Sequence, residues 1–427
     1  MADDRHTASA YAAAKESGVV WRVRHYTRRL AYIVETFHSW SDLPYVIVED
    51  EVWTSYTPPT GWRIVSYGSR IKEKADWELP YSGFLEKEGT HFLLPSWNEG
   101  GFFPGEGDFG WDLLAMGFYV LTLYPLYDWP YGYDEWGLYA WHRAPFYEAP
   151  FWKEPFLLKR WYELLERLEL HLPKPPFHWE IGWDIDHLYA WKGRDGLRWW
   201  LGGIRRGNLH LRLLARWGKV PDPYNTLSLI TAHFPPQHAR FFFLLSQKHS
   251  RDSLVSPSHP ELIQAIQNLH AQGYCIGIHP SFTTRENPSL LIQEKHLLEQ
   301  YLKKPVECSR QHYLRFFVPQ LFVSLVEAGI KEDYTLTFPK RSGFLLGTTL
   351  PIRAYRVDTD EVLPLWLIGP ALMDQVYLSQ GKAAELPLEV SRLFSVVKET
   401  GGRLHFLWHN STWEALPLTI FLEAQVK

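Results

Sequence analysis

The sequence has few cysteines and no long apolar run. Only two cysteines, Cys275 and Cys308, occur in 427 residues, which argues against a fold held together by disulfides. No run of about 18 uncharged apolar residues is present, so no membrane span is expected. The opening residues, MADDRHTASAYAAAKESG, lack the positive start and continuous apolar core of a secretory signal. We therefore expect a cytoplasmic protein.

The sequence also lacks a strong charge bias and the common nucleotide-binding motifs. Its formal net charge is -4 and no long basic run occurs, so we expect no nucleic-acid partner. No P-loop or dinucleotide fingerprint is present. The segment GFLLGTT, residues 343–349, has glycines but not the strand-to-helix setting of a phosphate-binding loop. No feature specifies the oligomeric state.

The length and one proline-rich segment predict two domains. A chain of 427 residues exceeds the size of an ordinary single domain. The segment HLPKPPFHW, residues 171–179, has three prolines that cannot continue the helical pattern of residues 157–170 before it. We expect a smaller α/β domain over residues 1–172 and a second domain over residues 173–427.

Aromatic residues are abundant, with 21 Trp, 23 Tyr and 24 Phe making up 16% of the chain. Two interpretations stay open: these rings fill a core, or some of them stack on sugar rings. The loops between Trp97 and Trp141 are the candidate sugar contacts, and Trp111 and Trp129 are the individual residues to test.

After the proline-rich segment, strand and helix patterns alternate. About seven strands are predicted, over residues 180–186, 239–247, 274–282, 305–313, 330–338, 362–368 and 403–410. Helices are predicted between them, over residues 258–273, 287–304, 318–329 and 386–402. This alternation indicates parallel βαβ units, in a sheet that is either open or closed into a barrel.

Polar residues stand at the carboxyl ends of several of these strands. They are Asp184, Asp186, His279, Arg310, His312 and His409. The carboxyl ends of parallel strands meet at one rim, where sites of α/β folds assemble. Asp374 ends a further apolar segment and could face the same site, although the sequence assigns it no role. This pattern predicts a site that holds a cation or moves a proton.

Four short motifs in this part of the chain resemble those of a known family. WDID (183–186), IGIHPSF (276–282), SRQHYLRF (309–316) and LHFLWHN (404–410) resemble, in order and context, the motifs of polysaccharide deacetylases, the NodB-type fold of carbohydrate esterase family 4. The resemblance spans about residues 177–415 and implies a distorted (β/α)7 barrel. Residues before 172 resemble an uncharacterised bacterial domain that accompanies such deacetylases and has no assigned activity.

The resemblance implies a hydrolase that uses a divalent metal, most simply zinc, to remove an acetyl group from an N-acetylated saccharide. In this family pattern Asp184 is the general base and Arg310 orients it. Asp186 and His279 are metal ligands, and His409 is the general acid. Because Asp184 and Asp186 fall on one face of a strand, their two roles are interchangeable on the sequence alone.

One motif departs from the family pattern. Thr283 stands where the family has a second metal-binding histidine, and a hydroxyl is a poor substitute for imidazole on zinc. Either His312, which we take as the third ligand, or His187 could replace it, or water could complete the site. The alternative is a catalytically inactive domain that binds a saccharide or a protein partner.

Each of these residues also has a purely structural interpretation. Asp184 and Asp186 could cap the following helix or accept backbone N–H groups. His279, His312 and His409 could be buried histidines with satisfied hydrogen bonds. A structural role for the aspartates does not explain why histidines stand at the matching ends of other strands.

Overall fold

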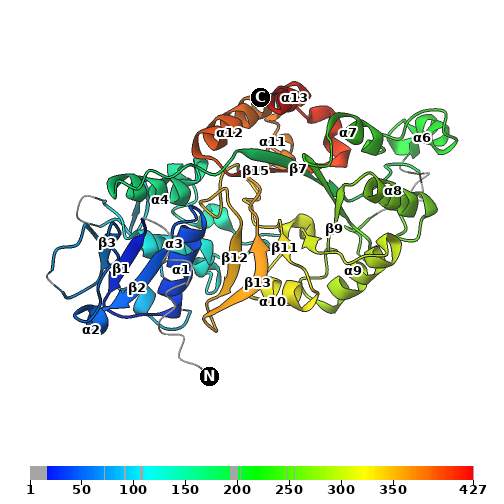
Figure 1. Ribbon diagram of the computed structural model, residues 1–427. Coiled ribbons are helices and arrows are strands. Elements are labelled where there is room, and N and C mark those ends of the chain that lie inside the picture. The colour runs from blue at the N-terminus through cyan, green and yellow to red at the C-terminus, as the bar shows by residue number, and fades with distance from the viewer. Residues whose placement is uncertain are drawn as a thin grey trace.

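The computed structural model describes residues 17–71, 73–90, 93–105, 109–192, 201, 203–247, 249–253 and 255–426. Two main sheets organise this part of the chain, a small one near the N-terminus and a large curved one that follows it (Figure 1). The structure is therefore α/β, as predicted from the alternation of strands and helices.

The small sheet has four parallel strands in the order β2-β1-β3-β4. The strands are β1 (Val19–Val23), β2 (Tyr45–Glu49), β3 (Arg63–Tyr67) and β4 (Trp77–Leu79). Helix α1 (Arg28–Ser39) connects the first two, and Thr27 caps it by accepting a hydrogen bond from the backbone N–H of Leu30 at 3.0 Å. The short helix α2 is Asp50–Trp53.

Aromatic loops and two further helices complete the first part of the chain. The elements are the hairpin β5 (Trp97–Asn98) and β6 (Gly101–Phe102), α3 (Leu113–Leu121) and α4 (Phe156–Arg167). Every residue of α3 is buried. Asp112 caps α3, accepting from the backbone N–H of Ala115 at 3.0 Å.

The large sheet has nine strands in the order β12-β13-β11-β10-β9-β8-β7-β15-β14. Their bounds are β7 (His178–Ile185), β8 (Ala239–Phe243), β9 (Cys275–Ile278), β10 (Cys308–Ser309), β11 (Glu332–Asp333), β12 (Ile352–Arg356), β13 (Glu361–Leu367), β14 (Leu372–Met373) and β15 (Arg403–His409). All neighbours pair in parallel except β12 and β13. The parallel βαβ arrangement is confirmed. The predicted number of about seven strands is wrong, because β12 and β14 also join the sheet.

Helices lie on the outer side of this curved sheet (Figure 1). They are α6 (Leu209–Arg216), α7 (Leu227–His233), α8 (Pro260–Ala271), α9 (Ser289–Leu302), α10 (Gln320–Glu327), α11 (Asp374–Leu378), α12 (Leu386–Thr400) and α13 (Leu418–Val426). The four helices predicted from periodicity correspond to α8, α9, α10 and α12. No pairing among the described residues joins β12 to β14, so the closed (β/α)7 barrel stays a prediction.

The two parts of the chain share one continuous hydrophobic core. Backbone hydrogen bonds cross between them, from Leu157 N–H to the Gly347 carbonyl at 2.9 Å and from Phe344 N–H to the Trp152 carbonyl at 2.8 Å. Helix α1 lies beside β12 (Figure 1), and Tyr32 Oη donates to the Arg353 carbonyl at 2.8 Å. The division at residue 172 falls between α4 and β7, but separate folding of the two parts stays a prediction.

Glycine at position 182 allows an arginine to cross β7. A Cβ atom at Gly182 would lie 2.3 Å from Nη2 and 2.7 Å from Nη1 of Arg310, distances that side chains cannot tolerate. The glycine in the predicted IGWD strand therefore opens the space through which Arg310 reaches the aspartate at the strand end.

Among the described residues, none of the helices combines the length and the apolar character needed to cross a bilayer.

Candidate metal centre

The structure brings all six predicted site residues together at one rim of the large sheet. Asp184 is the last residue but one of β7 and Asp186 directly follows that strand, while His409 ends β15 beside Asp184. His279 directly follows β9. Arg310 directly follows the two-residue strand β10, and His312 begins a short 3₁₀ helix two residues later. The sequence instead predicts that the strand continues through both residues.

Asp186, His279 and His312 form a compact group of potential metal ligands. One ligand atom from each lies within 4.8 Å of the others. Asp186 Oδ1 is 3.2 Å from His279 Nε2 and 3.7 Å from His312 Nε2. Both histidines are buried, with exposed fractions of 1% and 5%. One carboxylate and two imidazoles are a donor set that suits zinc and neighbouring transition metals.

A hydrogen bond at Nδ1 of His279 turns Nε2 of the same ring into this group. Its Nδ1 lies 2.6 Å from the backbone carbonyl of Arg310, and because a carbonyl only accepts, Nδ1 carries the proton. Nε2 faces the Asp186 carboxylate, and although burial lowers the pKa of His279, Asp184 and Asp186 outweigh it and raise this pKa. Neither Nε2 of His279 nor Oδ1 of Asp186 has a hydrogen bond, although both are buried. Positive charge is therefore favoured at this point, and either a metal ion or a second proton on Nε2 can supply it.

The electrostatics of His312 also favour a metal ligand. Burial lowers the pKa of His312 to about 3 even though the Asp186 carboxylate raises it. The imidazole is therefore neutral at pH 7, which is the form that binds metals. Its Nδ1 is buried without a hydrogen-bond partner.

Of the two histidines left open by the sequence, the structure places His312 in the group. The ring of His187 instead stacks on Tyr224, with centroids 6.3 Å apart and planes 16° apart. Thr283 is half-buried and its backbone carbonyl accepts from Asn287 N–H at 2.9 Å.

Asp184 is held by an arginine rather than by a helix N-terminus. Arg310 Nη1 donates to Asp184 Oδ1 at 2.8 Å, and both side chains are buried. Asp184 Oδ2 lies 3.8 Å from His279 Nε2. The carboxylate therefore has one oxygen fixed by a charge-assisted hydrogen bond and the other turned towards the candidate metal site.

Arg310 is itself held by a buried network. It donates from Nη1 to the Gly182 carbonyl at 3.1 Å and from Nε to the Tyr334 carbonyl at 3.2 Å. Nη2 lies 2.6 Å from His405 Nε2, and His405 Nδ1 lies 3.0 Å from Glu180 Oε1. Glu180, Gly182 and Asp184 lie on one face of β7, so this strand positions the whole network.

We expect Arg310→Met to lower the free energy of unfolding by about 3–5 kcal/mol, because it leaves the buried Asp184 carboxylate without its cation. The control is Arg356→Met, which removes a half-exposed partner of Asp358 at 2.6 Å and should cost no more than about 1 kcal/mol. Urea unfolding measures both. Equal losses in the two variants would show that Arg310 does not compensate a buried charge.

The sequence assigned no role to Asp374, which holds His409. Asp374 is fully buried, and its Oδ1 lies 2.8 Å from His409 Nδ1. Its Oδ2 accepts from the His409 backbone N–H at 2.9 Å and also from the Thr412 hydroxyl. Nδ1 of His409 thus carries the proton, and Nε2 lies 3.9 Å from Asp186 Oδ2. Burial lowers the pKa of His409, but Asp374 and Asp186 outweigh it and raise this pKa to about 10.

Two buried histidines outside the ligand group make stability depend on pH. Burial lowers the pKa of His405 to about 4 and that of His38 to about 3. Below about pH 6.5 the two histidines bind protons in the unfolded chain but not in the folded chain. The free energy of unfolding is therefore highest above that pH and decreases as the pH falls towards the folded-state pKa values. The loss should be about 1.4 kcal/mol per pH unit for each histidine.

Urea unfolding at roughly pH 7 and roughly pH 5, with a chelator present, checks this pH dependence. His38→Gln should reduce the slope, whereas His296→Gln should not, because the side chain of His296 is exposed. An unfolding free energy that stays constant over this range would contradict the expectation.

An aromatic pair from both parts of the chain lies beside the ligand group. Trp136 stacks on Tyr313, with centroids 5.7 Å apart and planes 10° apart, and Tyr313 directly follows His312 and is 40% exposed. Arg251 lies over the Trp136 ring at 3.8 Å. The predicted aromatic loops therefore reach the site through Trp136. Trp111 lies under Arg160, and Trp129 packs on Trp141 within the first part.

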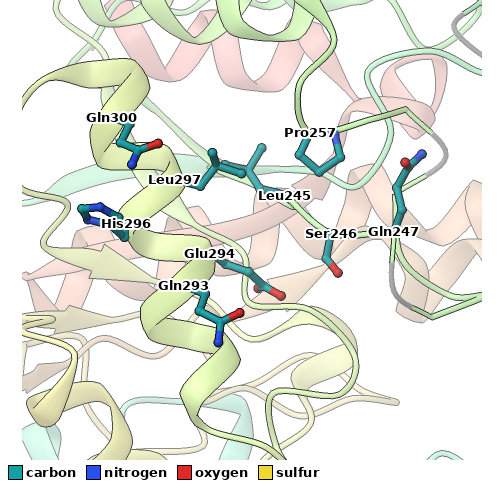
Figure 2. A pocket seen from close by; sticks show the side chains of 9 residues that line it. All are labelled: Leu245, Ser246, Gln247, Pro257, Gln293, Glu294, His296, Leu297 and Gln300. Carbon is teal, nitrogen blue, oxygen red and sulfur yellow. The ribbon is translucent and has the colours of Figure 1, made fainter.

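A cavity of about 590 Å³ lies between α9 and the chain after β8 (Figure 2). Leu245, Pro257 and Leu297 form its apolar wall. Glu294 also lines the cavity and accepts a hydrogen bond from the backbone N–H of Ser281 at 2.9 Å. Ser281 is two residues after His279 in the chain. None of the six predicted site residues lines this cavity, so it is distinct from the candidate metal centre.

No family model and no curated protein sequence matches the chain. Three similar solved structures are a proposed polysaccharide deacetylase from Mycobacterium smegmatis, a polysaccharide deacetylase from Bacillus cereus and a CE4 family pseudoenzyme from Bacillus anthracis. Each is 13% identical to this chain. The M. smegmatis match covers 59% of this chain and 84% of its own, with a TM-score of 0.37. The B. cereus match covers 58% and 88%, and the B. anthracis match 60% and 67%, each with a TM-score of 0.30. These likenesses are weak. The geometry of Asp186, His279 and His312 therefore carries the functional conclusion.

Proposed function

We propose that the chain is a divalent-metal-dependent hydrolase that removes an acetyl group from an N-acetylated saccharide. The observation that carries the proposal is the compact group of Asp186, His279 and His312, whose potential ligand atoms lie within 4.8 Å of one another. His312 supplies a neutral imidazole to this group. One divalent cation would satisfy the buried ligand atoms of all three side chains at once.

Asp186, His279 and His312 would hold the metal, and zinc, cobalt, nickel or manganese suit their mixed nitrogen and oxygen donors. The bound ion would polarise the amide carbonyl of the substrate and increase the acidity of water. Calcium and magnesium are disfavoured because they prefer oxygen ligands alone. The Nδ1 hydrogen bond of His279 to the Arg310 carbonyl fixes the ring in the orientation that ligation requires.

Asp184 is the proposed general base. Its Oδ1 accepts from Arg310 at 2.8 Å, so the carboxylate is kept ionised and correctly oriented. The other oxygen, Oδ2, faces the ligand group and can take a proton from the attacking water. The different partners support this division of roles: Asp184 lies against Arg310, and Asp186 lies against His279 and His312.

His409 is the proposed general acid. Its Nδ1 donates to Asp374, which leaves Nε2 directed at the ligand group from the strand next to β7. A proton on Nε2 can pass to the amine that leaves when the amide bond breaks. Asp374 is a positioning residue in this scheme, since it fixes the ring through both its side-chain and backbone hydrogen bonds.

The proposal includes a saccharide ligand bound near Trp136 and Tyr313, whose stacked rings lie beside His312. We also propose that the protein is cytoplasmic. Residues 173–427 would carry the chemistry on a barrel of the deacetylase type. Residues 1–172 would then supply part of the substrate-binding surface through Trp136.

The test is acetate release from N-acetylglucosamine oligosaccharides by protein loaded with zinc or cobalt. We expect acetate and a free amine in equal amounts, and no reaction after a chelator has removed the metal. Saccharide binding by metal-loaded protein without any acetate release would instead support a deacetylase-like domain that only binds its ligand.

A further inference from the structure

The only two cysteines of the sequence face each other across neighbouring strands. Cys275 is the first residue of β9 and Cys308 is the first residue of β10. Their Sγ atoms lie 3.5 Å apart, and both thiols are free. Nothing in the sequence alone indicates that these two residues lie side by side.

Strand register explains how two cysteines 33 residues apart meet. Ser309 pairs with Ile278, which places Cys308 beside Gly277. Cys275 and Gly277 are two residues apart and share a face of β9, so the thiols approach diagonally across the pair of strands. A disulfide requires the sulfurs to close from 3.5 Å to about 2.0 Å, and because diagonal neighbours lie about 7–8 Å apart, the starts of the two strands must also move closer together.

The surroundings distinguish the two thiols. Arg240 Nη1 lies 3.2 Å from Cys275 Sγ, and Arg240 also pairs with Glu332 at 3.1 Å. The hydrogen bond from Cys308 and the charge of Arg240 outweigh burial and lower the pKa of Cys275 to about 7. Cys275 is half-buried, whereas Cys308 is 4% exposed and its pKa is raised. This is the arrangement of an attacking thiolate with a protected resolving thiol.

We propose that Cys275 and Cys308 form a site of reversible oxidation, at which a hydroperoxide converts the two thiols into a disulfide. The Cys275 thiolate attacks a peroxide oxygen; the O–O bond breaks, hydroxide leaves and takes a proton to become water, and Cys275 becomes a sulfenic acid. Cys308 sulfur then attacks the Cys275 sulfur; the S–S bond forms, the S–O bond breaks, and a second water leaves with the Cys308 proton. A dithiol reverses the oxidation.

The bridge would join the starts of two strands whose other ends carry the candidate metal ligands. His279 follows β9 and His312 follows β10, each four residues after its cysteine. The cysteine pair is therefore outside the ligand group, at the opposite end of the same strands. Covalent closure of the chain between Cys275 and Cys308 should stabilise the fold against unfolding.

The test treats the folded full chain with hydrogen peroxide and then counts free thiols by alkylation and mass spectrometry under denaturing conditions. We expect both thiols to disappear together, a mass loss of two hydrogen atoms, one cross-linked peptide and full recovery with dithiothreitol. The same reaction in urea should be slower, because only the folded chain holds the sulfurs together.

Two variants separate the roles of the thiols. In Cys308→Ser, dimedone should trap a sulfenic acid on Cys275; in Cys275→Ser, Cys308 should stay a thiol. Oxidation of Cys275 alone to sulfinic acid in the unaltered chain, or equal bridging rates in folded and unfolded protein, would overturn the proposal. These readouts do not involve acetate release, so they are independent of the proposed hydrolase function.

Discussion

Asp186→Asn is expected to abolish acetate release and to weaken zinc binding by more than about 100-fold. Removing a residue that merely orients a metal ligand already costs about 10–100-fold in affinity, and Asp186 is the only carboxylate of the ligand group. An amide oxygen keeps the shape of the side chain but removes the charge that faces His279 Nε2. Rates of acetate release at increasing zinc concentrations would measure the loss.

The matched control for this variant is Thr283→Ala. Thr283 stands where the family pattern has a histidine, but a hydroxyl is a poor substitute for imidazole on zinc. Its removal should leave the zinc dependence of the reaction unchanged. A variant Asp186→Asn that keeps normal activity at the same zinc concentration would contradict the assignment of Asp186 as a ligand.

His409→Gln is expected to lower kcat by about 10²–10⁴-fold, the usual contribution of a general acid, while metal content stays normal. His409 Nε2 lies 3.9 Å from Asp186 Oδ2, whereas His409 Nδ1 is hydrogen-bonded to Asp374. The ring therefore faces the ligand group through Nε2. Steady-state kinetics and elemental analysis of the same preparation would separate loss of the acid from loss of the metal.

Asp374→Asn tests whether the histidine acts with its buried partner. We expect kcat to fall, and the double variant Asp374→Asn with His409→Gln to be hardly worse than His409→Gln alone, because residues that act as a unit are not additive. Multiplicative losses in the double variant would show that Asp374 contributes independently of His409. Loss of metal from His409→Gln would identify His409 as a ligand instead of an acid.

The main strands could be predicted because their sequence patterns are local. The apolar runs that end at Asp184, His279 and His409 correspond to β7, β9 and β15, and parallel topology then requires their carboxyl ends to meet at one rim. The sequence could not divide the duties of Asp184 and Asp186, because alternation places both on one face. The hydrogen bond of Arg310 to Asp184, made across Gly182, supports the proposed division.

The parts that were missed depend on contacts between distant segments. Glu180 and His405 both lie inside predicted strands, yet they become partners only because β7 and β15 pair in the register Glu180 to His405. Strand β14 has only two residues, Leu372–Met373, too short to give a periodicity signal. Asp374 follows it and reaches His409 only because β14 lies beside β15.

The most direct test of the metal centre is elemental analysis of the purified protein after dialysis against zinc, beside the variants His312→Ala and His187→Ala. The unaltered chain and His187→Ala should each carry one zinc ion, and His312→Ala should lose it, because His312 lies in the ligand group and the His187 ring stacks on Tyr224. Absence of zinc from the unaltered chain, or full retention by His312→Ala, would contradict a site built from Asp186, His279 and His312.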